Sequence, residues 1–159
     1  MAIHKKISGQ NQRDCRMKRP HLFAYGTLQV DAIMRAVTGH AYSSQAATLS
    51  GYARYRIKNA TYPGIIADTR AETSGRIYFD VDDTSWTKLD AFEGAPYQRL
   101  TLSVVAADGA TYLADAYVIP ASARGILSTA PWMLDQFLAH DQDTFMATYF
   151  AVRQPRPSY

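Results

Sequence analysis

The spacing of apolar residues changes at a single glycine near the start of the chain. Residues 21–25, His-Leu-Phe-Ala-Tyr, form a short apolar run typical of a buried strand, and Gly26 follows it directly. The next apolar residues recur at the three- and four-residue spacing of one helix face: Val30, Ile33, Met34 and Val37. Gly39 then marks a helix end. The pattern therefore predicts a strand, a bend at Gly26 and an amphipathic helix.

Several later stretches have the composition or the alternation of strands. Residues 47–57 mix small, β-branched and aromatic side chains, and a Pro63-Gly64 turn leads into a short apolar piece. In residues 74–81 apolar and polar side chains alternate, as in a half-buried strand. An Asp-Gly hairpin signal joins the last two alternating runs, residues 98–106 and 110–119.

Two more helices are predicted in the second half of the chain. Asp82, Asp83 and Thr84 offer side-chain oxygens for an N-cap, and Gly94 marks the end of that helix. Between these signals, large apolar side chains follow helical spacing: Trp86, Leu89 and Phe92. Pro131 favours the first turn of a last helix. Four residues form its apolar side: Leu134, Phe137, Leu138 and Phe145.

These elements predict an α+β fold. Five or more short strands and two or three helices occur in no regular strand–helix alternation, and consecutive hairpins favour an antiparallel-rich sheet that can curl into a barrel. The 159 residues have the length of one domain. We expect a flexible basic N-terminal extension over residues 1–19, a single domain over residues 20–150 and a loose tail over residues 151–159.

Composition narrows the class of protein. Hydrophobic residues make up 47% of the chain and charged residues 19%, which is ordinary for a soluble globular protein. No apolar run approaches the roughly 20 residues that cross a bilayer, so we expect no membrane partner. The first 20 residues contain no apolar segment of a secretory signal. We therefore expect a cytoplasmic protein.

Charge and ligand chemistry exclude other classes. Six Lys and Arg residues against Asp14 give residues 1–20 a charge of +5, so the total of +3 leaves about −2 for the rest. The body has no basic stripe interleaved with aromatic residues, which argues against nucleic-acid binding. The single Cys15 cannot form an intrachain disulfide, and the four histidines match no metal-binding motif. We expect neither a metal nor a cofactor.

The bend at Gly26 is the first candidate for chemistry. A strand that passes through Tyr25, Gly26, Thr27 and Leu28 into a helix leaves the first backbone N–H groups of that helix unpaired. Gly26 carries no side chain, so a ligand can approach its backbone closely. The positive end of the helix favours an anion such as a carboxylate. The alternative is a plain connection between strand and helix.

Glu93 is the second candidate. It is one of only two glutamates, and it lies in the apolar stretch Leu-Asp-Ala-Phe-Glu-Gly near the predicted end of a helix. The helix C-terminus, the nearby Asp90 and partial burial would all raise the pKa of its carboxyl towards neutrality, where a general acid/base works best. The alternative is a solvent-facing glutamate at a helix end.

Together the two stretches resemble the gamma-glutamyl cyclotransferase-like family, over roughly residues 21–148. The similarity lies in "FAYGTL", "LDAFEGAPYQR", the "YPG" of residues 62–64 and "APWMLDQF" near the C-terminus. The resemblance implies a small mixed or antiparallel β-barrel with flanking helices. It also implies that the loop amides hold the glutamyl end of the substrate and that Glu93 is the catalytic acid/base. The implied substrate-binding residues are those of the loop, Tyr25, Gly26, Thr27 and Leu28, and two pocket tyrosines, Tyr97 and Tyr117.

The chemistry that this family implies needs no cofactor. The α-amine of a gamma-glutamyl amine or peptide attacks its own γ-carbonyl, which releases 5-oxoproline and a free amine. The sequence departs from the glutathione-degrading branch, since the loop reads Gly-Thr-Leu and not Gly-Ser-Leu. The leaving amine and the oligomeric state therefore stay open. The alternative is a module on the same fold that binds a small amino-acid-like anion without turning it over.

Overall fold

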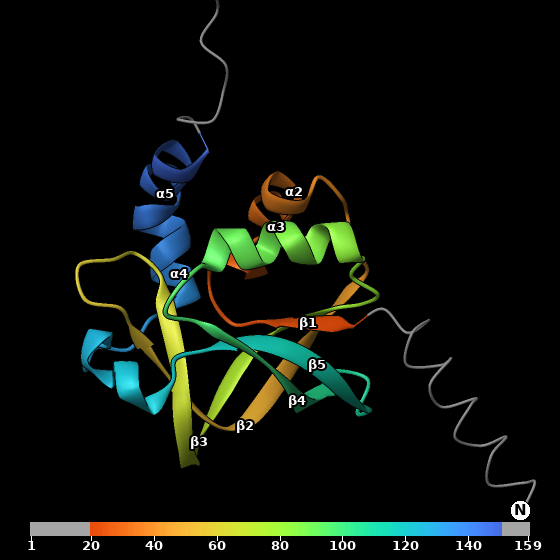
Figure 1. Ribbon diagram of the computed structural model, residues 1–159, viewed down its shortest axis with the longest axis horizontal. Helices are drawn as coiled ribbons and strands as arrows, with labels where there is room; N and C mark the ends of the chain where they lie inside the picture. The colour runs from red at the N-terminus through yellow and green to blue at the C-terminus, as the bar shows by residue number, and fades with distance from the viewer. Residues whose placement is uncertain (1–19, 151–159) are drawn as a thin grey trace, which may run out of the picture.

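Five strands close into a barrel in the computed structural model of the protein, which describes residues 20–150 (Figure 1). The strands are β1 (His21–Ala24), β2 (Ser44–Arg56), β3 (Pro63–Tyr78), β4 (Gln98–Ala106) and β5 (Thr111–Val118). Their order around the barrel is β1-β3-β2-β4-β5, and every pairing is antiparallel except that of β1 with β5. The predicted α+β fold with a mixed, mainly antiparallel barrel is confirmed. The predicted terminal segments, residues 1–19 and 151–159, lie outside the described residues.

The strand β3 is longer than the sequence pattern indicated. Pro63 and Gly64 do not form a turn; they are the first residues of a 16-residue strand that includes both of the expected pieces. Its partner β2 is also long, and the register between the two shifts at Gly51, which has a φ of 88°. This bulge lets the two strands bend together around the barrel. Residues 63–78 therefore form one continuous strand where the sequence pattern indicated two short pieces.

The bend after β1 contains a short 3₁₀ turn, η1 (Thr27–Gln29), before the helix α2 (Asp31–Thr38). Ile33 and Met34 of α2 are fully buried, and Gly39 ends the helix in the left-handed conformation with a φ of 78°. The predicted amphipathic helix is therefore confirmed, with one additional turn between it and the bend.

The helix α3 (Asp83–Glu93) has the predicted boundaries. The Asp82 side chain caps it by accepting a hydrogen bond of 2.7 Å from the Ser85 N–H. Gly94 ends it with a φ of 63°, and its N–H donates to the Asp90 carbonyl oxygen. This ending places Glu93 on the last residue of the helix.

The C-terminal helix differs from the prediction. It begins at Leu134 and not at Pro131, because Met133 is still extended, and it consists of three parts: α4 (Leu134–Gln136), the π-helical η3 (Phe137–Asp141) and α5 (Gln142–Tyr149). Phe137 is buried as expected, but Leu138 is 45% exposed. The wider π turn breaks the 3.6-residue periodicity on which the expected single apolar side depended.

The buried apolar side chains form three clusters, and β1 separates the two larger ones. Phe23 and Tyr25 belong to a cluster drawn from all five strands, which fills the barrel. Leu22 and Ala24 point the other way and pack with side chains of the helices. Figure 1 shows α2 and α3 lying side by side over the barrel near β1, with α4 and α5 standing beside them. The end of β1 is therefore the place where barrel, loop and helices meet.

A short 3₁₀ helix, η2 (Ala121–Ile126), follows β5.

None of the helices among residues 20–150 is long and apolar enough to cross a membrane. The cytoplasmic location expected from the sequence stays a prediction.

Candidate active site

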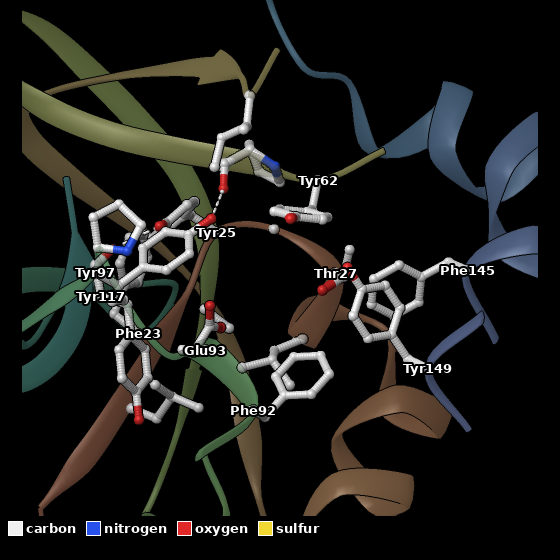
Figure 2. A pocket seen from close by; sticks show the side chains of 18 of the residues that line it. Phe23, Tyr25, Thr27, Tyr62, Phe92, Glu93, Tyr97, Tyr117, Phe145 and Tyr149 are labelled. Carbon is white, nitrogen blue, oxygen red and sulfur yellow. Dashed lines mark hydrogen bonds between the residues drawn. The ribbon is translucent and has the colours of Figure 1, made fainter. Parts of the chain in front are cut away.

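A cavity of about 260 Å³ opens at the end of β1, between the bend, the end of α3, the start of β3 and α5 (Figure 2). Its volume is just below the range of about 300–1,000 Å³ that is usual for small-molecule sites. The structure brings all seven candidate residues of the sequence to its lining: Tyr25, Gly26, Thr27, Leu28, Glu93, Tyr97 and Tyr117.

Glu93 reaches this cavity from the last residue of α3, and Figure 2 shows its carboxyl directed into the middle of the pocket. Burial raises the pKa of this carboxyl from its ordinary value of 4.5 to about 8. Within residues 20–150 no basic side chain forms an ion pair with it and no hydrogen bond reaches it. Glu93 is therefore a carboxyl whose proton is held near neutral pH.

The cause of this pKa shift is simpler than the sequence suggested. Burial is the cause of the raised pKa of Glu93, and the Asp90 carboxylate has partners of its own. It accepts a hydrogen bond of 2.8 Å from the Tyr117 hydroxyl, and it lies 3.3 Å from a guanidinium nitrogen of Arg99. The surrounding protein alone disfavours the ionised form of Glu93.

The loop at the bend supplies unpaired backbone donors. In the described part of the chain, the N–H groups of Gly26, Thr27 and Leu28 donate to no other residue, whereas the next N–H, of Gln29, bonds to the Gly26 carbonyl oxygen. Because a 3₁₀ turn and not an α-helix follows the bend, the helix-dipole contribution expected from the sequence is small. The three N–H groups themselves remain as donors for an anion.

The structure adds a second reason for a glycine at position 26. A Cβ there would lie 2.9 Å from two ring carbons of Pro63, the first residue of β3. Gly26 is therefore required for the close packing of the bend against β3, besides lining the cavity.

Three tyrosines build a neutral wall on one side of Glu93. The Tyr25 hydroxyl donates to the Tyr117 carbonyl oxygen at 2.6 Å, and the Tyr97 hydroxyl donates to the Pro63 carbonyl oxygen at 2.7 Å. The Tyr117 hydroxyl is held by Asp90. Burial raises the pKa of all three tyrosines well above the usual value, so they stay protonated. Their rings line the pocket while their hydroxyls fix the wall in place.

Sequence reasoning missed a second group of pocket residues. It includes four aromatic side chains from three segments: Tyr62, Phe92, Phe145 and Tyr149. The "YPG" and "AFEG" stretches contain the first two, and the four-residue spacing of Phe145 and Tyr149 was a signal for a shared helix face. That this face turns towards Glu93 depends on the path of the C-terminal helix, which the sequence pattern did not predict.

Acid/base chemistry on a small molecule is what this arrangement can perform. Among residues 20–150 no group of three or more metal-ligating side chains occurs. The described lining of the cavity contains one ionisable carboxyl, a set of neutral hydroxyls and rings, and the unpaired N–H donors of the bend.

Comparison with known proteins finds a matching protein family and several similar proteins. The family model for gamma-glutamyl cyclotransferase, AIG2-like, matches residues 22–134. AIG2-like protein C from Arabidopsis thaliana is 29% identical over 126 residues, which cover 79% of this chain and 73% of the relative. AIG2-like protein D from the same plant is 32% identical over 87 residues, 55% of this chain and 57% of the relative. The match to the second relative thus spans little more than half its length.

Solved structures show the same fold. The solution structure of an Arabidopsis thaliana protein superposes with a TM-score of 0.63 at 23% identity, over 86% of this chain and 95% of the other. The crystal structure of an AIG2-like protein from Mus musculus gives a TM-score of 0.57 at 21% identity, over 73% of this chain and 86% of the other. A structure named gamma-glutamyl cyclotransferase gives 0.55 at 16% identity, over 62% and 65%.

Proposed function

The chain belongs to the gamma-glutamyl cyclotransferase, AIG2-like family, and on that premise we propose that it cyclises a gamma-glutamyl amine or peptide. The products are 5-oxoproline and a free amine. One observation carries the proposal: the Glu93 carboxyl, with its pKa raised to about 8 by burial, lines the same cavity as the unpaired backbone donors of the bend. A general base that works near pH 7–8 needs a pKa in that range.

The proposed reaction is an intramolecular displacement. The α-amine nitrogen of the substrate forms a bond to its γ-carbonyl carbon, and the bond from that carbon to the leaving nitrogen breaks. Glu93 accepts one proton from the attacking nitrogen and returns it to the leaving nitrogen, so no proton is gained or lost overall. A positioned acid/base of this kind is worth roughly 10²–10⁴ in rate. No protein nucleophile is required, since both reacting groups belong to one molecule.

The remaining pocket residues would orient the substrate. The N–H groups of Gly26, Thr27 and Leu28 have no partner in the described chain, so they can hold the α-carboxylate or the oxygen of the tetrahedral intermediate. The three tyrosines Tyr25, Tyr97 and Tyr117 limit the space on one side of Glu93, which favours a folded glutamyl chain. Holding amine and carbonyl in attack geometry lowers the barrier by removing orientational freedom.

A second candidate is a binding module that holds an amino-acid-like anion without turnover. The unpaired amides of the bend support it, because they would bind a carboxylate whether or not Glu93 transfers a proton. Thermal stabilisation by glutamate or 5-oxoproline, together with no turnover of any gamma-glutamyl compound, would favour this candidate over the enzyme.

The test is release of 5-oxoproline from a panel of gamma-glutamyl amines and dipeptides. We expect turnover of at least one compound by the native chain and at least a 100-fold lower rate in Glu93→Gln, as for the loss of a general acid/base. Glu72→Gln is the matched control, since Glu72 is the other glutamate and lies exposed on β3. Equal rates in native chain and Glu93→Gln would contradict the proposal.

A further inference from the structure

The side of the cavity across from Tyr97 and Tyr117 is mostly aromatic, with Thr27 lying among the rings (Figure 2). Tyr62 precedes β3, Phe92 lies beside Glu93 on α3, and Tyr149 comes from α5. The Phe92 and Tyr149 rings meet edge-on at a centroid distance of 6.0 Å, and Tyr62 meets Tyr149 in the same way at 6.3 Å. Phe145 packs at 4.6 Å from Tyr149 behind them. We call these four residues the aromatic wall.

The aromatic wall lies where the departing half of a substrate would go, if the proposed function holds. Glu93 must reach both the attacking and the leaving nitrogen. The leaving nitrogen therefore lies beside the Glu93 carboxyl. On one side of that carboxyl the space is bounded by Tyr25, Tyr97 and Tyr117, whose hydroxyls are bonded within the protein. The substituent on the leaving nitrogen therefore extends along the other side.

The charge of the cavity limits what that substituent can be. Among the described residues that line the cavity, Glu93 is the only acidic one, and none is Lys or Arg. A second carboxylate on the leaving group would lose its hydration without gaining a counter-ion, which is costly. A flat ring would instead find edge and face contacts of the kind that aromatic pairs favour.

Resting on the proposed function, we infer that the preferred substrates are gamma-glutamyl arylalkylamides: amides whose leaving amine carries an aromatic ring and no further charge. Gamma-glutamyl amino acids and peptides, whose leaving part has a carboxylate, are disfavoured. Tyr62, Phe92 and Tyr149 are the specificity-determining residues in this inference.

Two matched substrates test the inference directly. Gamma-glutamyl phenethylamide and gamma-glutamyl phenylalanine share the ring and the linkage and differ only in the carboxylate of the second. We expect kcat/KM to be at least about tenfold higher for the phenethylamide. We also expect it to exceed the value for the amide of 1,5-diaminopentane, whose distal ammonium tests whether the wall serves a cation instead. Equal values, or preference for either charged substrate, would overturn the inference.

A pair of variants assigns the preference to the wall. Tyr149→Ala should reduce the kcat/KM ratio of phenethylamide to phenylalanine compound about fivefold, because the ring loses one face of its site. Tyr112→Ala is the control: Tyr112 is an aromatic residue of β5 that does not line the cavity, and the ratio should stay as in the native chain. An unchanged ratio in Tyr149→Ala contradicts the assignment.

Binding measurements separate failure of this inference from failure of the proposed function. The two ligands are titrated calorimetrically into Glu93→Gln and into the native chain if it turns over neither compound. At least fivefold tighter binding of the phenethylamide supports the aromatic wall even without catalysis. Equal or weaker binding of the phenethylamide would contradict the inference that the aromatic wall binds the leaving group, whatever the rate of 5-oxoproline release.

Discussion

The guanidinium of Arg54 holds the carbonyl oxygen of Tyr25 at 2.8 Å, and the same nitrogen donates to the Ser74 carbonyl oxygen at 2.8 Å. In a planar trans peptide the C=O and the following N–H point in opposite directions. Fixing the Tyr25 carbonyl therefore also fixes the direction of the Gly26 N–H, which has no partner in the described chain. Arg54 does not line the cavity, so it is a positioning residue for one of the proposed donors.

Replacing Arg54 should weaken substrate binding more than it slows the chemical step. In Arg54→Met the bend loses its anchor, and we expect KM for a gamma-glutamyl substrate to rise about tenfold with kcat changed less than about threefold, the pattern of lost uniform binding. Steady-state kinetics measure both constants. Arg76→Met is the control, since Arg76 bonds to Ser44 on the barrel and should leave KM unchanged. A fall in kcat alone, with KM unchanged, would count against this role.

Arg54 also shows which part of the site the sequence could not reveal. The strand β3 lies between β1 and β2 in the barrel, so the contact from Arg54 to the end of β1 crosses a whole strand. No spacing along the chain encodes such a contact. The bend at Gly26 and the helix end at Gly94 were predictable because glycine acts on the local backbone.

The meeting of Glu93 with the bend was predictable only through family resemblance. The two stretches are far apart in the chain, and their apolar patterns alone indicate a strand end and a helix end. The aromatic wall could not be predicted from the sequence for a different reason. Phe145 and Tyr149 follow a π turn, which changes the side of the helix on which a regular pattern would place their side chains.

Removing the Tyr117 hydroxyl should affect stability and not the reaction. This hydroxyl donates to Asp90 and not into the cavity, so Tyr117→Phe is expected to keep kcat/KM within about threefold and to lower the free energy of unfolding by about 1 kcal/mol. Tyr112→Phe is a matched control, because it also loses a hydroxyl–carboxylate bond, to Asp108, away from the pocket. A 100-fold loss of kcat/KM in Tyr117→Phe would show that the hydroxyl contacts the substrate.

A methyl group at position 26 should be poorly tolerated. The added Cβ of Gly26→Ala would meet the Pro63 ring at 2.9 Å, and overpacking of this kind costs about 1–3 kcal/mol of unfolding free energy. Denaturant unfolding measures the loss. Gly125→Ala is the control, since a Cβ there meets nothing within 4 Å. If the two variants were equally stable, the close packing of the bend on β3 would not be the reason for Gly26.

The half-buried Glu93, whose carboxyl faces the cavity, should make stability depend on pH in one direction. Its pKa is 4.5 ordinarily and about 8 in the folded chain, so between these values the folded state holds a proton that the unfolded state has released. The native chain therefore loses stability as the pH rises from 4.5 to about 8. Glu93→Gln has no such proton, and its melting temperature should exceed the native value by a margin that grows over this interval and is constant above it. A constant margin from pH 4.5 to 9 would exclude a raised pKa of Glu93.

The same carboxyl sets the expected pH dependence of the reaction. A general base accepts a proton only when it is ionised, so kcat/KM should rise with pH along a single limb with an apparent pKa of about 8, the value that burial produces for Glu93. Release of 5-oxoproline is measured from pH 6 to 9.5 at substrate concentrations well below KM. The substrate's α-amine also titrates in this region, so two substrates with different amine pKa values are compared. A limb that stays in place for both substrates belongs to the enzyme, whereas one that moves with the amine pKa would show that Glu93 does not control the rate.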